Sequence, residues 1–234
     1  MVQDKGWYYL VMDLGVVTIK AWEAVDRYLN LEVAGKKICC PYFTNHAGMC
    51  FIKAMKMAGI EEAERRKIMT VYNSNQLPYG WFRGKGTPEQ IEEATAGIAE
   101  MEEVDLEKAT AAGIGEFMRV YGLGVDCSGF VYNVLTSAGI KFEREVFKAG
   151  AFTFAGQASR QITDQEVQST DLILVKKING EYSHVAIVLE KERELWICQS
   201  TSTISPAGVV VSKFTEWKTL IEGGRLELRR LKLD

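Results

Sequence analysis

The sequence predicts an α+β protein, because helical patterns occupy its first half and short strand patterns occupy its second half. Between Val16 and Leu31, apolar residues recur at three- and four-residue spacings, which is typical of a helix with one buried face. From Asp171 onward, short apolar runs alternate with turn residues such as Asn179-Gly180, a hairpin signal. Helices followed by antiparallel strands indicate the α+β class.

Capping residues and glycines mark the expected helix ends. Thr87 can cap a helix, Pro88 suits its first position and Gln90 completes a capping box. Gly122 and Gly139 are typical residues after a helix end. The pattern predicts a loop at 73–86 and helices at 16–31, 50–58, 61–72, 87–103, 105–121 (with Asp105 as its cap) and 127–138.

The C-terminal part reads as a set of short strands after a polar, irregular connection at 140–170. The run from Val185 to Leu189 is apolar at every position, which predicts a strand that is buried on both faces. In the tail at 225–231, charged residues alternate with leucines, so we expect an edge strand with a charged outer face. The predicted strands are 171–177, 183–190, 195–201, 209–212 and 225–231.

Composition and charge narrow the possible partners. The 234 residues carry a formal net charge of −3, so a basic surface for nucleic acid is not expected. No run approaches the roughly 18 consecutive apolar residues of a membrane span. The first 15 residues lack the order of a signal peptide, so the expected location is the cytoplasm, with an exported form left open.

The chain has five cysteines and only two histidines, His46 and His184. An odd number of cysteines without a secretory signal favours reduced thiols over disulfides. The set Cys39, Cys40, His46 and Cys50 has donor atoms that suit zinc, but its spacings match no familiar structural site. We therefore assign these residues to packing and a loop, and expect no metal.

Cys127 is the candidate for nucleophilic chemistry. It lies at the start of a predicted helix, where backbone N–H groups and the helix dipole favour a thiolate with a lowered pKa. His184, on a later strand, could be its base, and Gln199 on the next strand could orient the imidazole. Strand alternation places Gln199 on the face of Ile197 and predicts that it, rather than Cys198 on the opposite face, lies within hydrogen-bond reach of His184.

Four segments between residues 124 and 213 resemble the NlpC/P60 family of cysteine peptidases. Gln199 falls where many members have His, a position at which the family accepts His, Asn or Gln, and Thr170 replaces the usual Gly. The family's Pro-Tyr loop is matched by Pro78-Tyr79. The four segments are DCSGFV (126–131), TDLILV (170–175), SHVAIVLE (183–190), and ICQST (197–201) followed by GVVVS (208–212).

The resemblance implies a papain-like core, in which the helix that carries the nucleophile packs on an antiparallel sheet. This core would span 123–234, and 1–122 would form an enlarged helical N-terminal region, packed on the core or inserted into it. The implied roles are nucleophile for Cys127, base for His184 and orienting group for Gln199. Substrate contacts are implied for Asp126, Ser128, Ser183 and Tyr79.

The implied reaction is cleavage of amide bonds through a thioester, in substrates such as bacterial cell-wall peptides, without a cofactor. Two alternatives remain: an acyl or amide transferase on the same scaffold, and a non-catalytic module that binds a protein partner. The acidic predicted helix at 89–107 motivates the second alternative. We also expect the aromatic loop at 73–86, which includes Tyr79 and Arg83, to narrow the groove beside Cys127.

Overall fold

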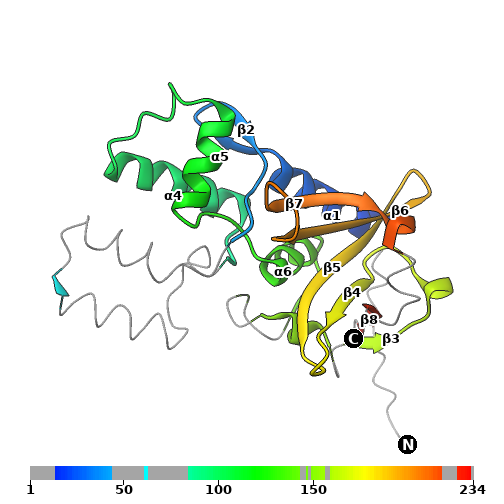
Figure 1. Cartoon of the computed structure of the whole chain (residues 1–234). Coiled ribbons are helices and arrows are strands. Elements are labelled where there is room, and N and C mark those ends of the chain that lie inside the picture. The colour runs from blue at the N-terminus through cyan, green and yellow to red at the C-terminus, as the bar shows by residue number, and fades with distance from the viewer. Residues whose placement is uncertain are drawn as a thin grey trace, which may run out of the picture.

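The computed structural model describes residues 14–43, 61–62, 84–142, 146, 149–155, 159–217 and 226–232. Over these residues the fold is α+β, with a six-stranded antiparallel sheet as its largest element (Figure 1). The predicted class is therefore confirmed. The sheet order is β3(Ser159–Gln161), β8(Leu226–Leu231), β4(Leu172–Lys176), β5(Tyr182–Lys191), β6(Glu194–Thr201) and β7(Gly208–Lys213).

Two helices cover one face of this sheet: α1(Leu14–Leu29) and α6(Cys127–Ser137) (Figure 1). Alternate residues of β5, among them Val185 and Ile187, point into the apolar core that the sheet shares with both helices. Ala186 and Val188 belong to a second, smaller apolar cluster instead. The α1 helix, from the N-terminal part of the chain, thus packs against the same core as the helix that begins at Cys127.

The remaining described elements of the N-terminal part pack on a two-stranded sheet. This sheet pairs β1(Leu31–Val33) with β2(Lys36–Ile38). The helix α4(Pro88–Met101) contacts β1, and α5(Ala111–Val120) contacts β2 (Figure 1). The predicted division of the chain at residues 122 and 123 stays a prediction.

Capping residues set the helix boundaries, and the structure corrects one of the predicted helix starts. The capping box of Thr87 and Gln90 is present, as predicted. Asp105, however, closes only a turn, accepting hydrogen bonds from the N–H groups of Glu107 and Lys108. The helix starts later because Thr110 is its cap and accepts from Gly113.

Other expected helices end earlier than predicted or lie outside the described residues. The helix predicted at 16–31 ends at Leu29, because Leu31 already pairs in β1. The acidic segment 89–107 is not one helix, since α4 ends at Met101. The helices predicted at 50–58 and 61–72, apart from residues 61–62, lie outside the described residues.

The predicted edge strand at 225–231 is wrong in its placement. β8 lies inside the sheet, between β3 and β4, and its arginines find partners within the fold. Arg229 is 9% exposed and donates to Ser159, while Arg230 donates to the buried Asp171 at 2.7 and 2.8 Å. An alternating charged strand is therefore internal here because each guanidinium is paired.

Within the described residues, no helix is both long and apolar enough to cross a membrane.

Candidate active site

The N-terminus of α6 positions Cys127. Asp126 is the cap residue, and its Oδ1 accepts from the backbone N–H of Gly129 at 2.7 Å. Gly129 is required by a close approach, since a Cβ atom there would lie 2.2 Å from the carbonyl oxygen of Gly84. The motif DCSG thus places the thiol at the first position of the helix, with another backbone segment crossing directly beside it.

Two segments from the N-terminal part flank the turn before Cys127. Val125 forms a parallel bridge with Tyr42 on one side and an antiparallel bridge with Lys85 on the other. The backbone N–H of Asp126 donates to Gly84 at 2.8 Å. From the sheet, the hydroxyl of Ser200 donates to the carbonyl of Val125 at 2.6 Å. Segments far apart in the sequence therefore fix the backbone that carries Cys127.

His184 and Gln199 are in direct contact, as strand alternation predicted. His184 Nε2 lies 2.6 Å from Gln199 Oε1. An amide oxygen only accepts, so Nε2 carries the proton and Nδ1 is left as the acceptor nitrogen. Cys198 belongs to the apolar core on the helix side of the sheet, as expected for the opposite face.

Cys127 meets the sheet where two strands separate. Pairing between β5 and β6 stops at Ile187 and Cys198. Beyond this point the backbone N–H of Val185, the residue after His184, hydrogen bonds to the sulfur of Cys127. The charge of Asp126 acts on both Cys127 and His184, which places the thiol, the carboxylate and the imidazole in one electrostatic environment.

The expected low pKa of Cys127 is wrong for this resting structure. Burial, followed by the negative charge of Asp126, raises the pKa of the Cys127 thiol to about 11, outweighing the N–H groups of Val185 and Ser128 and the charge of Lys85. Burial lowers the pKa of His184 below its ordinary value of 6.5, although Gln199 and Asp126 act in the opposite direction. At neutral pH both groups are therefore uncharged.

Lys85 is a site neighbour that sequence reasoning missed. Only 5% of it is exposed, and its Nζ lies 2.7 and 2.6 Å from the two carboxylate oxygens of Asp126. The same Nζ is 2.5 Å from Ser128 Oγ. Nothing in the local pattern Gly84-Lys85-Gly86 sets this lysine apart from a surface residue, because its partners lie about forty residues later.

Tyr42 is a second neighbour that was missed. Burial is the largest cause that raises the pKa of Tyr42 to about 12, followed by the charge that Cys127 carries once ionised and by the charge of Asp126. Pro41-Tyr42 is thus a Pro-Tyr pair beside the cysteine turn, while Pro78-Tyr79, to which the sequence pattern pointed, lies outside the described residues. The signal was available in the sequence, but Tyr42 lies 85 residues before Cys127 and carries no obvious link to it.

The structure places the other predicted site residues as follows. Asp126 and Ser128 lie beside Cys127 and bind Lys85. Ser183 is exposed, and its hydroxyl is 3.4 Å from the carbonyl of Val175. Tyr79 lies outside the described residues, as do Arg83 and the other aromatic residues of its loop.

The candidate metal set cannot be assembled from the described part of the chain. Cys39 is exposed and Cys40 is buried, and both sulfurs contact backbone carbonyls. His46 and Cys50 lie outside the described residues. Among the residues that are described, no three His, Cys, Asp or Glu side chains gather as metal ligands would.

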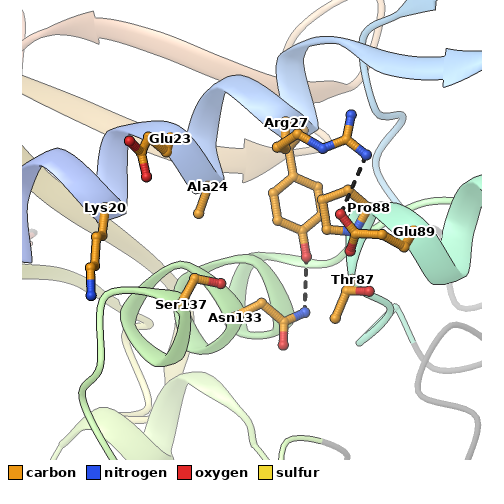
Figure 2. A pocket seen from close by; sticks show the side chains of 10 residues that line it. Lys20, Glu23, Ala24, Arg27, Thr87, Pro88, Glu89, Asn133 and Ser137 are labelled. Atoms are coloured by element: carbon orange, nitrogen blue, oxygen red, sulfur yellow. Dashed lines mark hydrogen bonds and ion pairs between the residues drawn. The ribbon is translucent and has the colours of Figure 1, made fainter.

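A pocket of about 370 Å³ opens between α1, α6 and the start of α4 (Figure 2). Tyr28 and Asn133 both line this pocket, and Asn133 Nδ2 donates to the Tyr28 hydroxyl at 2.9 Å. Arg27 reaches across to Glu89 at 3.3 Å. The lining includes neither Cys127 nor His184, so this pocket is separate from the cysteine site.

The structure thus places a cysteine at a helix start and, on the sheet that this helix covers, a histidine bonded to an amide. Residues 113–216 match the model of the NlpC/P60 family, which confirms the predicted resemblance. The family is one of the cysteine peptidase and amidase superfamily.

A solved structure with similarity to the chain is the crystal structure of a Staphylococcus aureus protein described as similar to lipoprotein, NLP/P60 family. The two share 24% sequence identity over 48% of this chain and 34% of that chain, with a TM-score of 0.32. The present chain therefore spans about one third of the length of that protein. No curated protein matches the chain at a significant level.

Proposed function

We propose that the protein is a cysteine hydrolase that cleaves amide bonds, with Cys127 as nucleophile, His184 as base and Gln199 as the orienting group. The observation that carries this proposal is the 2.6 Å contact between His184 Nε2 and Gln199 Oε1. This contact occupies one ring nitrogen and leaves Nδ1 free to accept the thiol proton. The bond from Val185 to the Cys127 sulfur supports the same assignment, because it brings the thiol to the strand that carries His184.

The Cys127 thiol and the His184 imidazole, both neutral before the reaction, act together on the amide substrate. As Sγ of Cys127 attacks the carbonyl carbon of the amide, its proton passes to His184 Nδ1, and the carbonyl oxygen takes up negative charge. The imidazolium then gives its proton to the leaving nitrogen as the C–N bond breaks, which leaves a thioester. Water attacks the thioester while His184 accepts a proton from it, and that proton returns to the sulfur as the acid leaves.

Two groups are suited to stabilise the oxyanion. One is the N-terminus of α6, where backbone N–H groups and the helix dipole favour negative charge next to Cys127. The other is the hydroxyl of Tyr42, whose raised pKa keeps it protonated and able to donate at neutral pH. The helix start carries Cys127 itself, and Tyr42 is close enough for the charge of Cys127 to act on it.

The proposed substrates are peptides derived from the bacterial cell wall, on the strength of the family match at residues 113–216. The test incubates the full chain with synthetic cell-wall peptides that contain D-glutamate linked to a diamino acid, and follows the products by mass spectrometry. Cleavage by the native chain, and none by Cys127→Ala, is the expected result. Equal cleavage by both proteins would contradict the proposal.

The two alternatives predict other outcomes of the same experiment. A transferase would give an amide of an added amine instead of the free acid, because both reactions pass through the thioester. A binding module would give no product at all. For the acidic segment 89–107, the structure already assigns internal partners to two members: Glu89 and Glu92 pair with Arg27.

A further inference from the structure

Lys85 occupies a built site next to the nucleophile. Its ammonium group has three donors, and three acceptor atoms surround it: both carboxylate oxygens of Asp126 and the hydroxyl of Ser128, at 2.5–2.7 Å. Its side chain is 6% exposed and that of Asp126 is 22% exposed. Asp126 and Ser128 flank Cys127 on either side in sequence, so the ammonium group is attached to both neighbours of the thiol.

The backbone of Lys85 is fixed as firmly as its side chain. It pairs with Val125, and its carbonyl accepts from Asn133 Nδ2 of α6 at 3.1 Å. The missing side chain of Gly129 makes room for it, since a Cβ there would lie 2.9 Å from Lys85 Cα. Holding a buried lysine in this way costs conformational entropy and desolvation free energy, which a solvent-exposed lysine would not require.

The charges around the thiol explain what such a lysine can do. Of the charged and titratable groups that act on Cys127, Asp126 at the start of α6 opposes a thiolate and Lys85 favours one. Facing the same place are His184 on β5, which is neutral before the reaction, and Tyr42 on the segment beside Val125. Without Lys85, the developing negative charge on sulfur would face the Asp126 carboxylate with no fixed positive charge nearby among the described residues.

We propose that Lys85 is a positioning residue of this site: its buried ammonium group balances the Asp126 carboxylate, so that the Cys127 thiolate forms beside a neutral pair. The proposal rests on the proposed function, because it concerns the same thiol. It adds a residue from a separate part of the chain, the loop before α4, to the residues on which the reactivity of Cys127 depends.

The test measures how the rate of alkylation of Cys127 by iodoacetamide depends on pH, with peptide mass spectrometry to identify the labelled cysteine. In Lys85→Met we expect the apparent pKa of Cys127 to rise by about one unit, which slows labelling about tenfold at pH values below it. Lys85→Arg should keep most of the native profile. Lys213→Met is the matched control, because this exposed lysine on β7 pairs with Glu194 on β6. It should leave the pH dependence of Cys127 labelling unchanged.

Asp126→Asn removes the negative charge but keeps the helix cap, because Asn can still cap α6 through its side-chain oxygen. Alone it should lower the apparent pKa of Cys127, and combined with Lys85→Met it should restore the profile toward the native one. These two variants also test the proposal if Lys85→Met fails to fold. A native profile in Lys85→Met, or no effect of Asp126→Asn, would overturn the proposal.

The readout also distinguishes this proposal from the proposed function. If His184→Ala leaves the labelling of Cys127 unchanged, then the proposed function fails, whatever Lys85 does. If His184→Ala slows labelling while the Lys85 and Asp126 variants do not shift its pH dependence, then only the role of Lys85 fails.

Discussion

Among the single residues of the candidate site, the thiol of Cys127 and the imidazole of His184 are both neutral, and the amide of Gln199 holds the imidazole. A carboxylate in place of Gln199 would stabilise an imidazolium, whereas the amide fixes the ring orientation without adding charge. This agrees with the lowered pKa of His184 and the raised pKa of Cys127, of about 11. In the proposed reaction, the proton is therefore transferred during the attack, because the two groups form no ion pair at rest.

Replacement of Gln199 tests the orienting contact. In Gln199→Ala, His184 Nε2 loses its acceptor, so the imidazole samples other orientations, and we expect turnover to fall about tenfold. Cys127→Ala should abolish turnover. The matched control is Cys198→Ala, the neighbour on the opposite face of β6, which should retain turnover. Loss of activity in the control equal to that in Gln199→Ala would remove the case for a specific contact.

The pH dependence of the reaction follows from His184. Because burial lowers its pKa below 6.5, the base should be neutral above that value, and the rate should fall only at lower pH. Gln199→Glu places a carboxylate against the imidazole, which should raise the pKa and move the acidic limb of the rate profile to higher pH. An acidic limb that stays in place in Gln199→Glu would show that another group controls it.

The lowered pKa of His184 also affects the stability of the fold. A folded-state pKa below the unfolded value means that the unfolded chain binds more protons, so this group makes the protein less stable as pH falls below 6.5.

For the helices and strands, backbone conformation at a few positions decides how the elements meet. Thr170 precedes β4, and its φ is +74°, a left-handed conformation that a β-branched residue rarely adopts. Its N–H nevertheless donates to Val188 at 2.7 Å, and the residue is 9% exposed. Thr170 therefore holds a backbone conformation that suits glycine better, at a cost in stability.

Thr170→Gly should relieve this strain and stabilise the protein by about 1 kcal/mol, measured by urea unfolding. The control is Thr163→Gly, at a residue with φ of −89° whose N–H and hydroxyl bind Glu166, and it should destabilise. A destabilised Thr170→Gly variant would show that side-chain packing outweighs the backbone strain.

Replacement of Gly129 and of Gly97 by Ala should change the free energy of unfolding in opposite directions. Gly129→Ala would drive Cβ into the backbone of Gly84 and Lys85, so we expect a loss of about 2–3 kcal/mol in the free energy of unfolding. At Gly97, in α4, an added Cβ would have no atom within 4 Å, so Gly97→Ala should stabilise by about 0.5–1 kcal/mol through its higher helix propensity. Urea unfolding measures both, and equal effects of the two changes would contradict the close approach at α6.

Local patterns in the sequence predicted most of these elements because the forces behind them are local. The capping box at Thr87, the stop at Gly139 and the run from Val185 to Leu189 each depend on neighbouring residues, and all three appear as predicted. The alternation of β6 also predicted the contact between Gln199 and His184.

The features that escaped prediction depend on contacts between distant residues. The charges of Arg229 and Arg230 suggest an edge strand, because the sequence does not show that Ser159 and Asp171 bind them inside the sheet. Lys85 and Tyr42 resemble ordinary loop residues until the turn at Val125 is placed between them. The pKa of Cys127 was predicted in the wrong direction because burial is a property of the whole fold, whereas the helix start is visible in the sequence.

Across the molecule as a whole, the site is shared between two parts of the chain. The NlpC/P60 match begins at residue 113, but Tyr42 and Lys85 lie well before it and contact the turn that carries Cys127. The hydroxyl of the fully buried Tyr28, on α1, donates to Gly86 at 2.8 Å, which ties the segment of Lys85 to a helix in the core. The N-terminal part thus contributes to the site and its support.

The proposed reaction requires that Cys127, activated by His184, forms a covalent acyl intermediate, which can be trapped. The full chain is mixed with an activated ester such as p-nitrophenyl acetate, quenched in acid, and measured by intact-mass and peptide mass spectrometry. We expect one acyl group per chain, on Cys127 and labile to hydroxylamine, absent in Cys127→Ala and formed far more slowly in His184→Ala. Acylation at another residue, or an equal rate in His184→Ala, would show that Cys127 and His184 do not act together as a nucleophile and its base.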